Sequence, residues 1–131
     1  MTQNREAIDA LADRLVAAVE SGDEAAMRDI YSPDLTFVLY TDGETRDREA
    51  AIGAFVTLRR AMTDVRLRVF DRQLTETGYV SQQVIDFTAP DGTRMSVPHC
   101  LIVAVRAGRI ARIDEYLDSQ QLAPLLAQVA S

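Results

Sequence analysis

Apolar side chains recur at helical spacing over the first part of the chain. In residues 5–20 they stand at i, i+3, i+4 and i+7, which predicts an amphipathic helix. Ser21-Gly22-Asp23 follows this stretch; glycine suits the left-handed position after a helix, and aspartate suits the N-cap of the next one. A short second helix is therefore expected up to Ile30 or Tyr31, with Pro33 as the stop signal.

The next part of the chain combines one strand with one helix. Residues 35–40 are rich in β-branched and aromatic side chains and are too few for a stable helix, so they predict a strand. Residues 47–62 return to helical spacing, with Asp47 as the N-cap and Ile52 and Phe55 on the apolar side.

Apolar and polar positions alternate over most of the second half. The alternation predicts four strands at 65–70, 79–88, 95–105 and 110–117. Short turns separate them, which predicts an antiparallel meander. Helical spacing returns near the C-terminus, where Asp118 and Gln121 resemble a capping box, and Pro124 stands inside the pattern.

Helices segregated from an antiparallel sheet place the chain in the α+β class. We expect a cone-shaped roll in which a curved antiparallel (mixed) sheet wraps around a long helix and the N-terminal helices close an apolar pocket. No linker, repeat or low-complexity segment interrupts residues 1–131, so a single domain is expected.

Composition excludes several kinds of chemistry. All 14 basic residues are arginine, so Schiff-base and lysine-base catalysis are excluded. With one histidine and one cysteine, neither an internal disulfide nor a His/Cys zinc site is expected. The net charge of −6 argues against nucleic acid and anionic membranes as partners. No apolar run is long enough to span a membrane and the N-terminus is polar, so we expect a cytoplasmic protein.

The order of elements resembles the nuclear transport factor 2-like superfamily. That group includes ketosteroid isomerase, scytalone dehydratase, limonene epoxide hydrolase and the SnoaL-like polyketide cyclases. The resemblance covers nearly the whole chain, and its motifs are Ser21-Gly22-Asp23, residues 31–37, residues 107–110 and residues 114–118. These are scaffold motifs, so they support the fold more strongly than any activity.

Two registers are open for the last hairpin. A two-residue turn pairs Val103 with Arg112, which sets an apolar side chain against a charged one. A three-residue loop with a glycine bulge pairs Val103 with Ala111 instead. Because register follows the hydrophobic pattern, the second is favoured, and it places His99 opposite Glu115.

The same argument applied to the preceding hairpin matches Ile85 with Val97 and brings Gln83 beside His99. One face of the sheet then becomes apolar except for three adjacent polar residues. Its members are Gln83, Ile85, Phe87, Met95, Val97, His99, Leu101, Val103, Ala111, Ile113, Glu115 and Leu117. In the family that the chain resembles, this face lines the ligand cavity.

A carboxylate beside a histidine in an apolar pocket can act as a general acid/base pair, and we predict His99 and Glu115 as catalytic residues. The alternative is that the two simply satisfy each other at the rim of a core. Tyr40, at the end of the first strand, is predicted to point at the ligand; its alternative is a phenol at the sheet edge in water. The predicted ligand-binding residues are Gln83, Tyr40, Ile85, Phe87, Leu101 and Ile113.

The resemblance also shows departures. The catalytic aspartate of the ketosteroid isomerases aligns with Leu39 and their second carboxylate falls near Leu101, so steroid-type isomerase activity is not expected. Limonene epoxide hydrolase carries a catalytic aspartate at the position of Glu115, but Gln83 and Ile85 stand at its other two sites. Scytalone dehydratase uses two histidines where this chain has one. The aspartate–histidine pair of the polyketide cyclases is nearest to His99 with Glu115.

We therefore expect a hydrophobic small-molecule ligand and, if the protein is an enzyme, cofactor-free isomerisation, cyclisation, dehydration or hydration without a metal. In this reading His99 moves the proton and Glu115 orients or assists it. The alternative is a non-catalytic domain for ligand binding or dimerisation. A homodimer is expected through the convex sheet face, which carries Ile102, Ala104 and Ile110.

Overall fold

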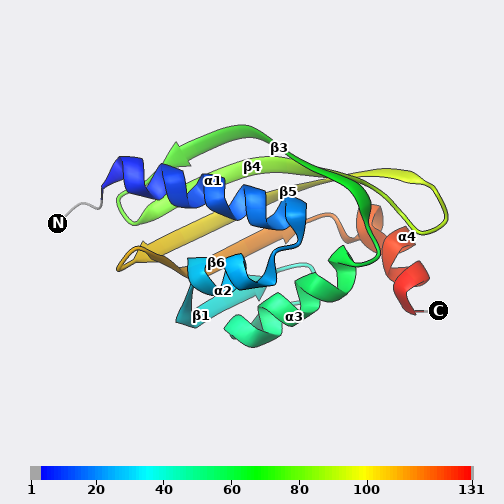
Figure 1. Ribbon diagram of the computed structural model, residues 1–131, viewed down its shortest axis with the longest axis horizontal. Helices are drawn as coiled ribbons and strands as arrows, with labels where there is room; N and C mark the ends of the chain where they lie inside the picture. Colours follow the sequence, from blue (N-terminus) through cyan, green and yellow to red (C-terminus); the bar gives the residue numbers. More distant parts are fainter. Residues whose placement is uncertain (1–3, 131) are drawn as a thin grey trace.

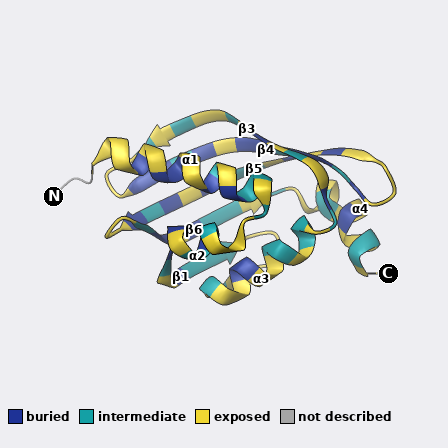
Figure 2. Cartoon of the chain, in the orientation of Figure 1, coloured by how far each residue is buried: buried dark blue, intermediate teal, exposed yellow. Residues whose placement is uncertain are grey.

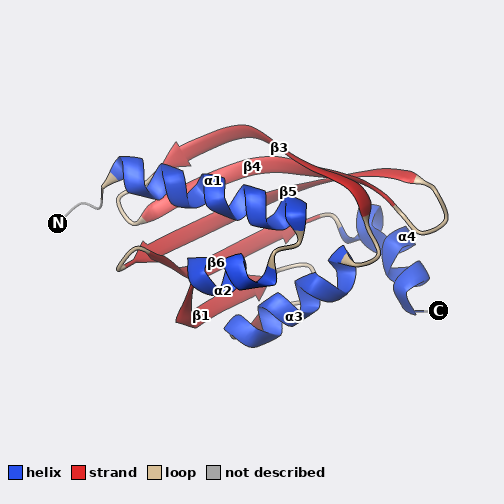
Figure 3. Ribbon diagram, in the orientation of Figure 1, coloured by secondary structure: helices blue, strands red, loops and turns tan. Residues whose placement is uncertain are grey.

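Four helices and six strands make up the chain in the computed structural model, which describes residues 4–130 (Figures 1 and 3). In order they are α1 (Arg5–Ser21), α2 (Glu24–Ile30), β1 (Tyr31–Leu39), β2 (Glu44–Arg46), α3 (Arg48–Arg59), β3 (Thr63–Leu74), β4 (Gly78–Thr88), β5 (Arg94–Arg106), β6 (Arg109–Leu117) and α4 (Ser119–Ala130). The predicted domain 1–131 also takes in residues 1–3 and 131, which lie outside the described residues.

The strands form one mixed sheet in the order β2-β1-β6-β5-β4-β3. β3 to β6 are an antiparallel meander, as predicted, while β1 runs parallel to β6. The sheet is curved and does not close into a barrel, and α1, α2 and α3 lie over one of its faces (Figure 1). The α+β prediction is therefore confirmed. The short β2 was missed, because three mostly exposed residues carry no readable alternation.

The helix ends are set by the residues that the sequence indicates. Gly22 ends α1 in the left-handed conformation, with φ of 68°. The Asp23 and Asp47 side chains cap α2 and α3 by accepting hydrogen bonds from backbone N–H groups, as predicted. The Arg59 guanidinium of α3 donates to the carbonyls of Val19 and Glu20, so α3 also supplies partners for the last turn of α1.

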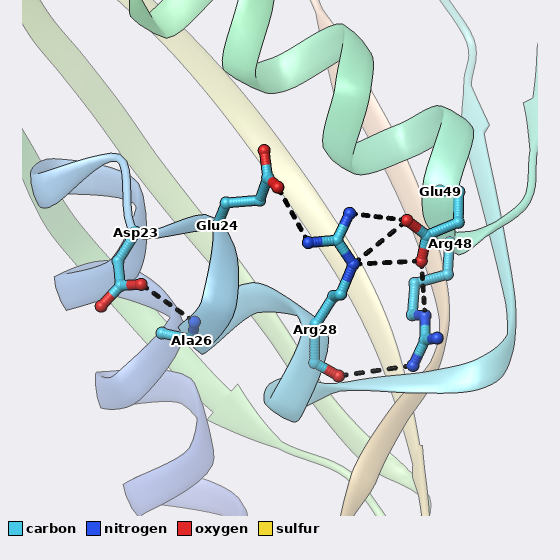
Figure 4. Close-up of polar contacts among 6 residues, drawn as sticks. All are labelled: Asp23, Glu24, Ala26, Arg28, Arg48 and Glu49. Atoms are coloured by element: carbon cyan, nitrogen blue, oxygen red, sulfur yellow. Dashed lines mark hydrogen bonds and ion pairs between the residues drawn. The ribbon is translucent and has the colours of Figure 1, made fainter.

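An ion-pair cluster joins α2 to the start of α3 (Figure 4). Arg28 lies between Glu24 and Glu49, with N–O distances of 2.8 Å and 2.6 Å. Arg48 pairs with Glu49 as well and donates to the Arg28 carbonyl. These side chains are largely exposed, so the cluster positions the two helices and adds little stability.

The core has two parts. Figure 2 shows buried positions along the strands that the helices cover. The larger part lies between α1, α2, α3 and the concave face of the sheet. The smaller part lies where α4 meets the end of α3 and the β4–β5 hairpin, and is centred on Phe87 and Leu125, both with 0% exposure. Phe87 was predicted to line the pocket, but it is buried in this second part because α4 covers that end of the sheet.

The register of the last hairpin differs from the prediction. The turn has two residues, Ala107 and Gly108, both at positive φ, which is the I′-like geometry that suits a tight hairpin. A bulge between Ala104 and Val105 then shifts the pairing, so that apolar residues still face each other. As a result Glu115 pairs with Leu101, and His99 pairs with Leu117 rather than with Glu115.

The bulge also changes which side chains face outward. Ile110 was predicted on the convex face, but it pairs with Val105 and is fully buried in the larger core. Ile102 is exposed on the outer face as predicted, and Ala104 is half-buried there. The helix α2 ends at Ile30, as predicted, and Pro33 lies three residues further on, inside β1. The irregular pairing between Tyr31 and Thr36 accommodates it.

Candidate functional site

A cavity of about 500 Å³ lies between the concave face of the sheet and the helices α1, α3 and α4. Its volume falls in the range of small-molecule sites. Most of the wall is apolar, and six of the predicted site residues lie on it: Gln83, Ile85, His99, Leu101, Ile113 and Glu115. Tyr40 and Phe87 are not part of the wall.

Tyr40 lies on the outer face of the sheet. Leu39, its neighbour, lines the cavity, so strand alternation turns the tyrosine away from it. The Tyr40 ring stacks on Tyr116 with a centroid distance of 4.3 Å, and its hydroxyl donates to Asp114 at 2.9 Å. The prediction that Tyr40 points into the pocket is therefore wrong.

His99 takes part in a chain of hydrogen bonds along β4 and β5. Its Nδ1 lies 3.2 Å from the Val97 carbonyl oxygen, which can only accept, so Nδ1 carries the proton. Its Nε2 must then accept from the Gln83 amide at 2.8 Å. The Gln83 oxygen in turn accepts from the Ser81 hydroxyl at 2.8 Å. The predicted contact between Gln83 and His99 is present.

This chain of hydrogen bonds favours neutral histidine. Burial lowers the pKa of His99, and the Val97 carbonyl opposes this only in part. Protonation would put a second N–H on His99, facing the amide hydrogens of Gln83. The Gln83 amide would have to turn over, and its bond from Ser81 would be lost. His99 is thus held as a neutral tautomer with its lone pair already occupied.

Glu115 is the carboxyl group on the cavity wall whose pKa is raised. It lies between Leu39 of β1 and Leu101 of β5, and its half-buried side chain lines the cavity. Burial raises the pKa of Glu115 to about 7, while the charge of Arg46 pulls it the other way. Within residues 4–130 its carboxyl group forms neither a hydrogen bond nor an ion pair, so the predicted contact with His99 is absent.

Both arginines on the cavity wall are paired with carboxylates. Arg46 of β2 meets Asp42 at 2.8 Å and Glu44 at 3.3 Å. Arg72 of β3 meets two carboxylates of α1, Asp9 and Asp13, each at 2.8 Å. Each cation is thus offset by two anions, although the charge of Arg46 still acts on Glu115.

Aromatic side chains complete the wall around Glu115. Phe37 and Leu39 alternate inward along β1 and both line the cavity, as does the buried Tyr31. Burial raises the pKa of Tyr31, and the charge of Glu115 raises it further. The sequence analysis missed Phe37 and Tyr31 as wall residues. Alternation along residues 35–39 was the signal that could have identified Phe37.

Within residues 4–130, no three His, Cys, Asp or Glu side chains lie close enough together to hold a metal ion. None of the helices in this part of the chain is long and apolar enough to cross a membrane.

The fold has many counterparts among solved structures. IdmH from Streptomyces antibioticus, whose proposed activity is polyketide cyclase, is 22% identical with a TM-score of 0.80, over 92% of this chain and 98% of that one. A Catenulispora acidiphila protein with a ketosteroid isomerase-like fold, in complex with trimethylamine, is 18% identical with a TM-score of 0.75, over 92% of each chain. A Jannaschia protein, proposed to be a SnoaL-like polyketide cyclase, is 16% identical with a TM-score of 0.77, over 98% of this chain and 99% of that one.

These identities establish a shared fold and no shared activity. A search of curated proteins finds no match. The model of the SnoaL-like domain family matches residues 12–113, which is most of the chain. The curved mixed sheet, the helices over its concave face and the cavity between them agree with that match. The chain belongs to the SnoaL-like domain family, within the nuclear transport factor 2-like superfamily.

Proposed function

We propose that this SnoaL-like protein binds a small hydrophobic molecule in the cavity and transfers a proton on it without a cofactor, with Glu115 as the acid/base. One observation carries the proposal. The Glu115 carboxyl group lines an otherwise mostly apolar cavity, has no hydrogen-bond partner within residues 4–130, and has a pKa raised to about 7. A general acid/base works best when its pKa lies near the operating pH.

His99 has a different role in this proposal from the one expected from sequence. Its Nε2 accepts from Gln83 and its pKa is lowered, so it is a weak base in the resting site. We assign it as a positioning residue that fixes the amide of Gln83. Ile85, Leu101 and Ile113 form the apolar contact surface for the ligand.

The chemistry that suits this arrangement is proton transfer beside a carbonyl group. The Glu115 carboxylate takes the proton from a carbon next to the carbonyl, leaving an enolate. The protonated Glu115 then returns the proton to the same or another atom of the ligand, which gives exchange or isomerisation. Tyr31, which lines the same cavity, is the hydroxyl donor that we assign to the ligand oxygen.

Hydrogen–deuterium exchange tests this proposal directly. 2-Acetylcyclohexanone is incubated with the protein in deuterated buffer, and loss of its acidic C–H signal is followed by NMR. We expect exchange that rises with pH around 7 and falls at least about 100-fold in Glu115→Gln. Glu76→Gln, the same change in the exposed turn between β3 and β4, is the matched control. Equal exchange by wild type and Glu115→Gln, or none above buffer, would reject the proposal.

The trimethylamine complex of the Catenulispora protein supports a small organic ligand for this chain as well. The alternative function, ligand binding or dimerisation without turnover, is favoured by a separate observation on the outer face. Ile102 and Tyr116, on neighbouring strands there, are 44% and 45% exposed.

We propose that this face joins two copies of the chain as a homodimer, because adjacent exposed apolar side chains mark interaction surfaces. Light scattering after size exclusion should give twice the chain mass for wild type and the chain mass for Ile102→Asp. A wild-type monomer would reject the dimer.

We also propose a cytoplasmic location. The support is the single cysteine, Cys100, which leaves the chain without a partner for an internal disulfide and suits a reducing compartment. Fractionation of cells that express the full chain should recover it with cytoplasmic markers, and recovery from the medium would contradict the proposal.

A further inference from the structure

The surroundings of Glu115 combine a carboxyl group with aromatic faces. Phe37 pairs with Ile113 on β6, two residues before Glu115, and lines the same cavity. Tyr31 is buried on the wall of the same cavity, within range of the Glu115 charge. Aromatic faces attract cations through the ring quadrupole, and a carboxylate attracts them by charge. A carboxylate flanked by aromatic side chains in an apolar cavity is the chemistry that recognises an organic ammonium ion.

The other charges around the cavity favour the same ligand class. Arg46 and Arg72 each meet two carboxylates and His99 is held neutral, so the cations on the described wall are already offset by anions, with only the Arg72 Nε left without a hydrogen-bond partner. A ligand without N–H or O–H donors would leave an ionised Glu115 with no partner, which is costly in a desolvated site. An ammonium group supplies both the donors and the opposite charge.

We propose that the cavity binds a hydrophobic amine, an apolar body carrying one ammonium group, with that group donating to Glu115 between Tyr31 and Phe37. The proposal names the class of ligand that the cavity binds. It rests on the proposed function, because it assumes that the cavity is a ligand site. It requires no turnover.

Ionisation of Glu115 sets the pH dependence of this binding. With a pKa of about 7, the carboxylate fraction is about 3% at pH 5.5 and about 90% at pH 8. The affinity for an amine that stays cationic should therefore rise about 30-fold between these values. At pH 7 about half a proton should leave the protein for each amine bound.

Other charged or titratable groups also face this part of the cavity. They are Arg46 on β2 with Asp42 in the turn before it, Tyr31 on β1, His99 on β5, and Arg72 and Tyr79 on β3 and β4; the wall residues from α1, α3 and α4 carry no charge. Of these, His99 is the one whose ordinary pKa lies between pH 5.5 and 8, so its contribution must be separated from that of Glu115.

Three matched probes test the proposal by calorimetry on the full chain: benzylamine, benzyl alcohol and benzoate. We expect benzylamine to bind with the 30-fold rise, benzyl alcohol to bind with no rise, and benzoate to bind more weakly than benzyl alcohol. Glu115→Gln should lose the pH dependence and keep benzyl alcohol binding, which shows that its cavity is intact. His99→Gln should keep the pH dependence.

The wild-type protein alone suffices to overturn the proposal. Titrations at pH 7 in two buffers of different ionisation enthalpy give the proton count, and uptake or no change on benzylamine binding would contradict it. So would benzyl alcohol binding as tightly as benzylamine at pH 8, or no binding of either probe. If the protein catalyses deuterium exchange but binds benzylamine no more tightly than benzyl alcohol, this inference alone is rejected. If it binds benzylamine preferentially but catalyses no exchange, only the proton-transfer function is rejected.

Discussion

Replacing Glu115 by Gln should stabilise the fold at high pH and leave it nearly unchanged at low pH. The carboxyl group of Glu115 has an ordinary pKa of 4.5 and a folded-state pKa of about 7 because burial disfavours its charged form. For an acid whose pKa is raised by folding, the stabilising form is the protonated one. Its contribution is complete below pH 4.5 and is lost as the pH rises through 7.

The size of the effect follows from the shift. A rise from 4.5 to about 7 corresponds to about 3 kcal/mol between the two protonation states. At pH 8 the wild-type protein has lost nearly all of this contribution to its free energy of unfolding. At pH 5 it has lost about 1 kcal/mol, because Glu115 is already mostly ionised in the unfolded chain at that pH. Glutamine keeps the shape without the charge. The free energy of unfolding of Glu115→Gln, relative to that of wild type, should therefore rise by about 2.5 kcal/mol from pH 5 to pH 8.

Urea unfolding of wild type and Glu115→Gln at pH 5 and pH 8 measures this difference. At pH 8 the variant should also melt about 10 °C above wild type. Glu76→Gln, in the exposed turn between β3 and β4, makes the same change in net charge and serves as the control. A stability difference between wild type and Glu115→Gln that is the same at both pH values would refute the reasoning. In that case Glu115 would not be desolvated in the folded protein.

Three other substitutions test the packing and the hydrogen-bond network. Gly78→Ala should cost about 3 kcal/mol or more in urea unfolding, since an added Cβ would lie 2.0 Å from the Val103 carbonyl oxygen; unchanged stability would show that the strands can separate there. Gln83→Glu should raise the pKa of His99 above its usual value, because a carboxylate accepts from protonated Nε2; NMR follows the single histidine, and an unmoved pKa would contradict the assigned tautomer. Leu125→Ala should cost about 3 kcal/mol and speed amide exchange in α4, whereas unchanged exchange would mean that other contacts hold the helix.

Local signals in the sequence were enough to place most of the fold. Gly22 and the aspartate caps mark helix ends because the backbone conformation or the unpaired N–H groups there demand those residue types. Alternation identified the inward face of β4 and β5, so the contact between Gln83 and His99 was predictable. These features depend on residues close in sequence or on a single hairpin.

Features that depend on distant residues could not be predicted in the same way. The pairing of Arg72 with Asp9 joins residues far apart in the chain, and nothing in either local sequence indicates the other. Tyr40 faces outward because the end of β1 aligns with β6, where Tyr116 offers a stacking surface. Ile110 is buried because the bulge between Ala104 and Val105 shifts the pairing, so that Ile110 faces Val105 at the start of β6.

The register of the last hairpin decides which residue can transfer a proton. In the predicted register His99 faces Glu115, and such a pair would hold the histidine charged and the carboxyl ionised. In the structure β6 is shifted against β5 by two residues relative to the predicted register, which is about 7 Å along the strand. The side chains of His99 and Glu115 therefore both line the cavity but are not paired with each other. Each is then desolvated separately, which raises the pKa of Glu115 and lowers that of His99. The offset thus turns an expected ion pair into a neutral histidine and a carboxyl group that is about half ionised at pH 7, and leaves Glu115 as the one that can exchange a proton near that pH.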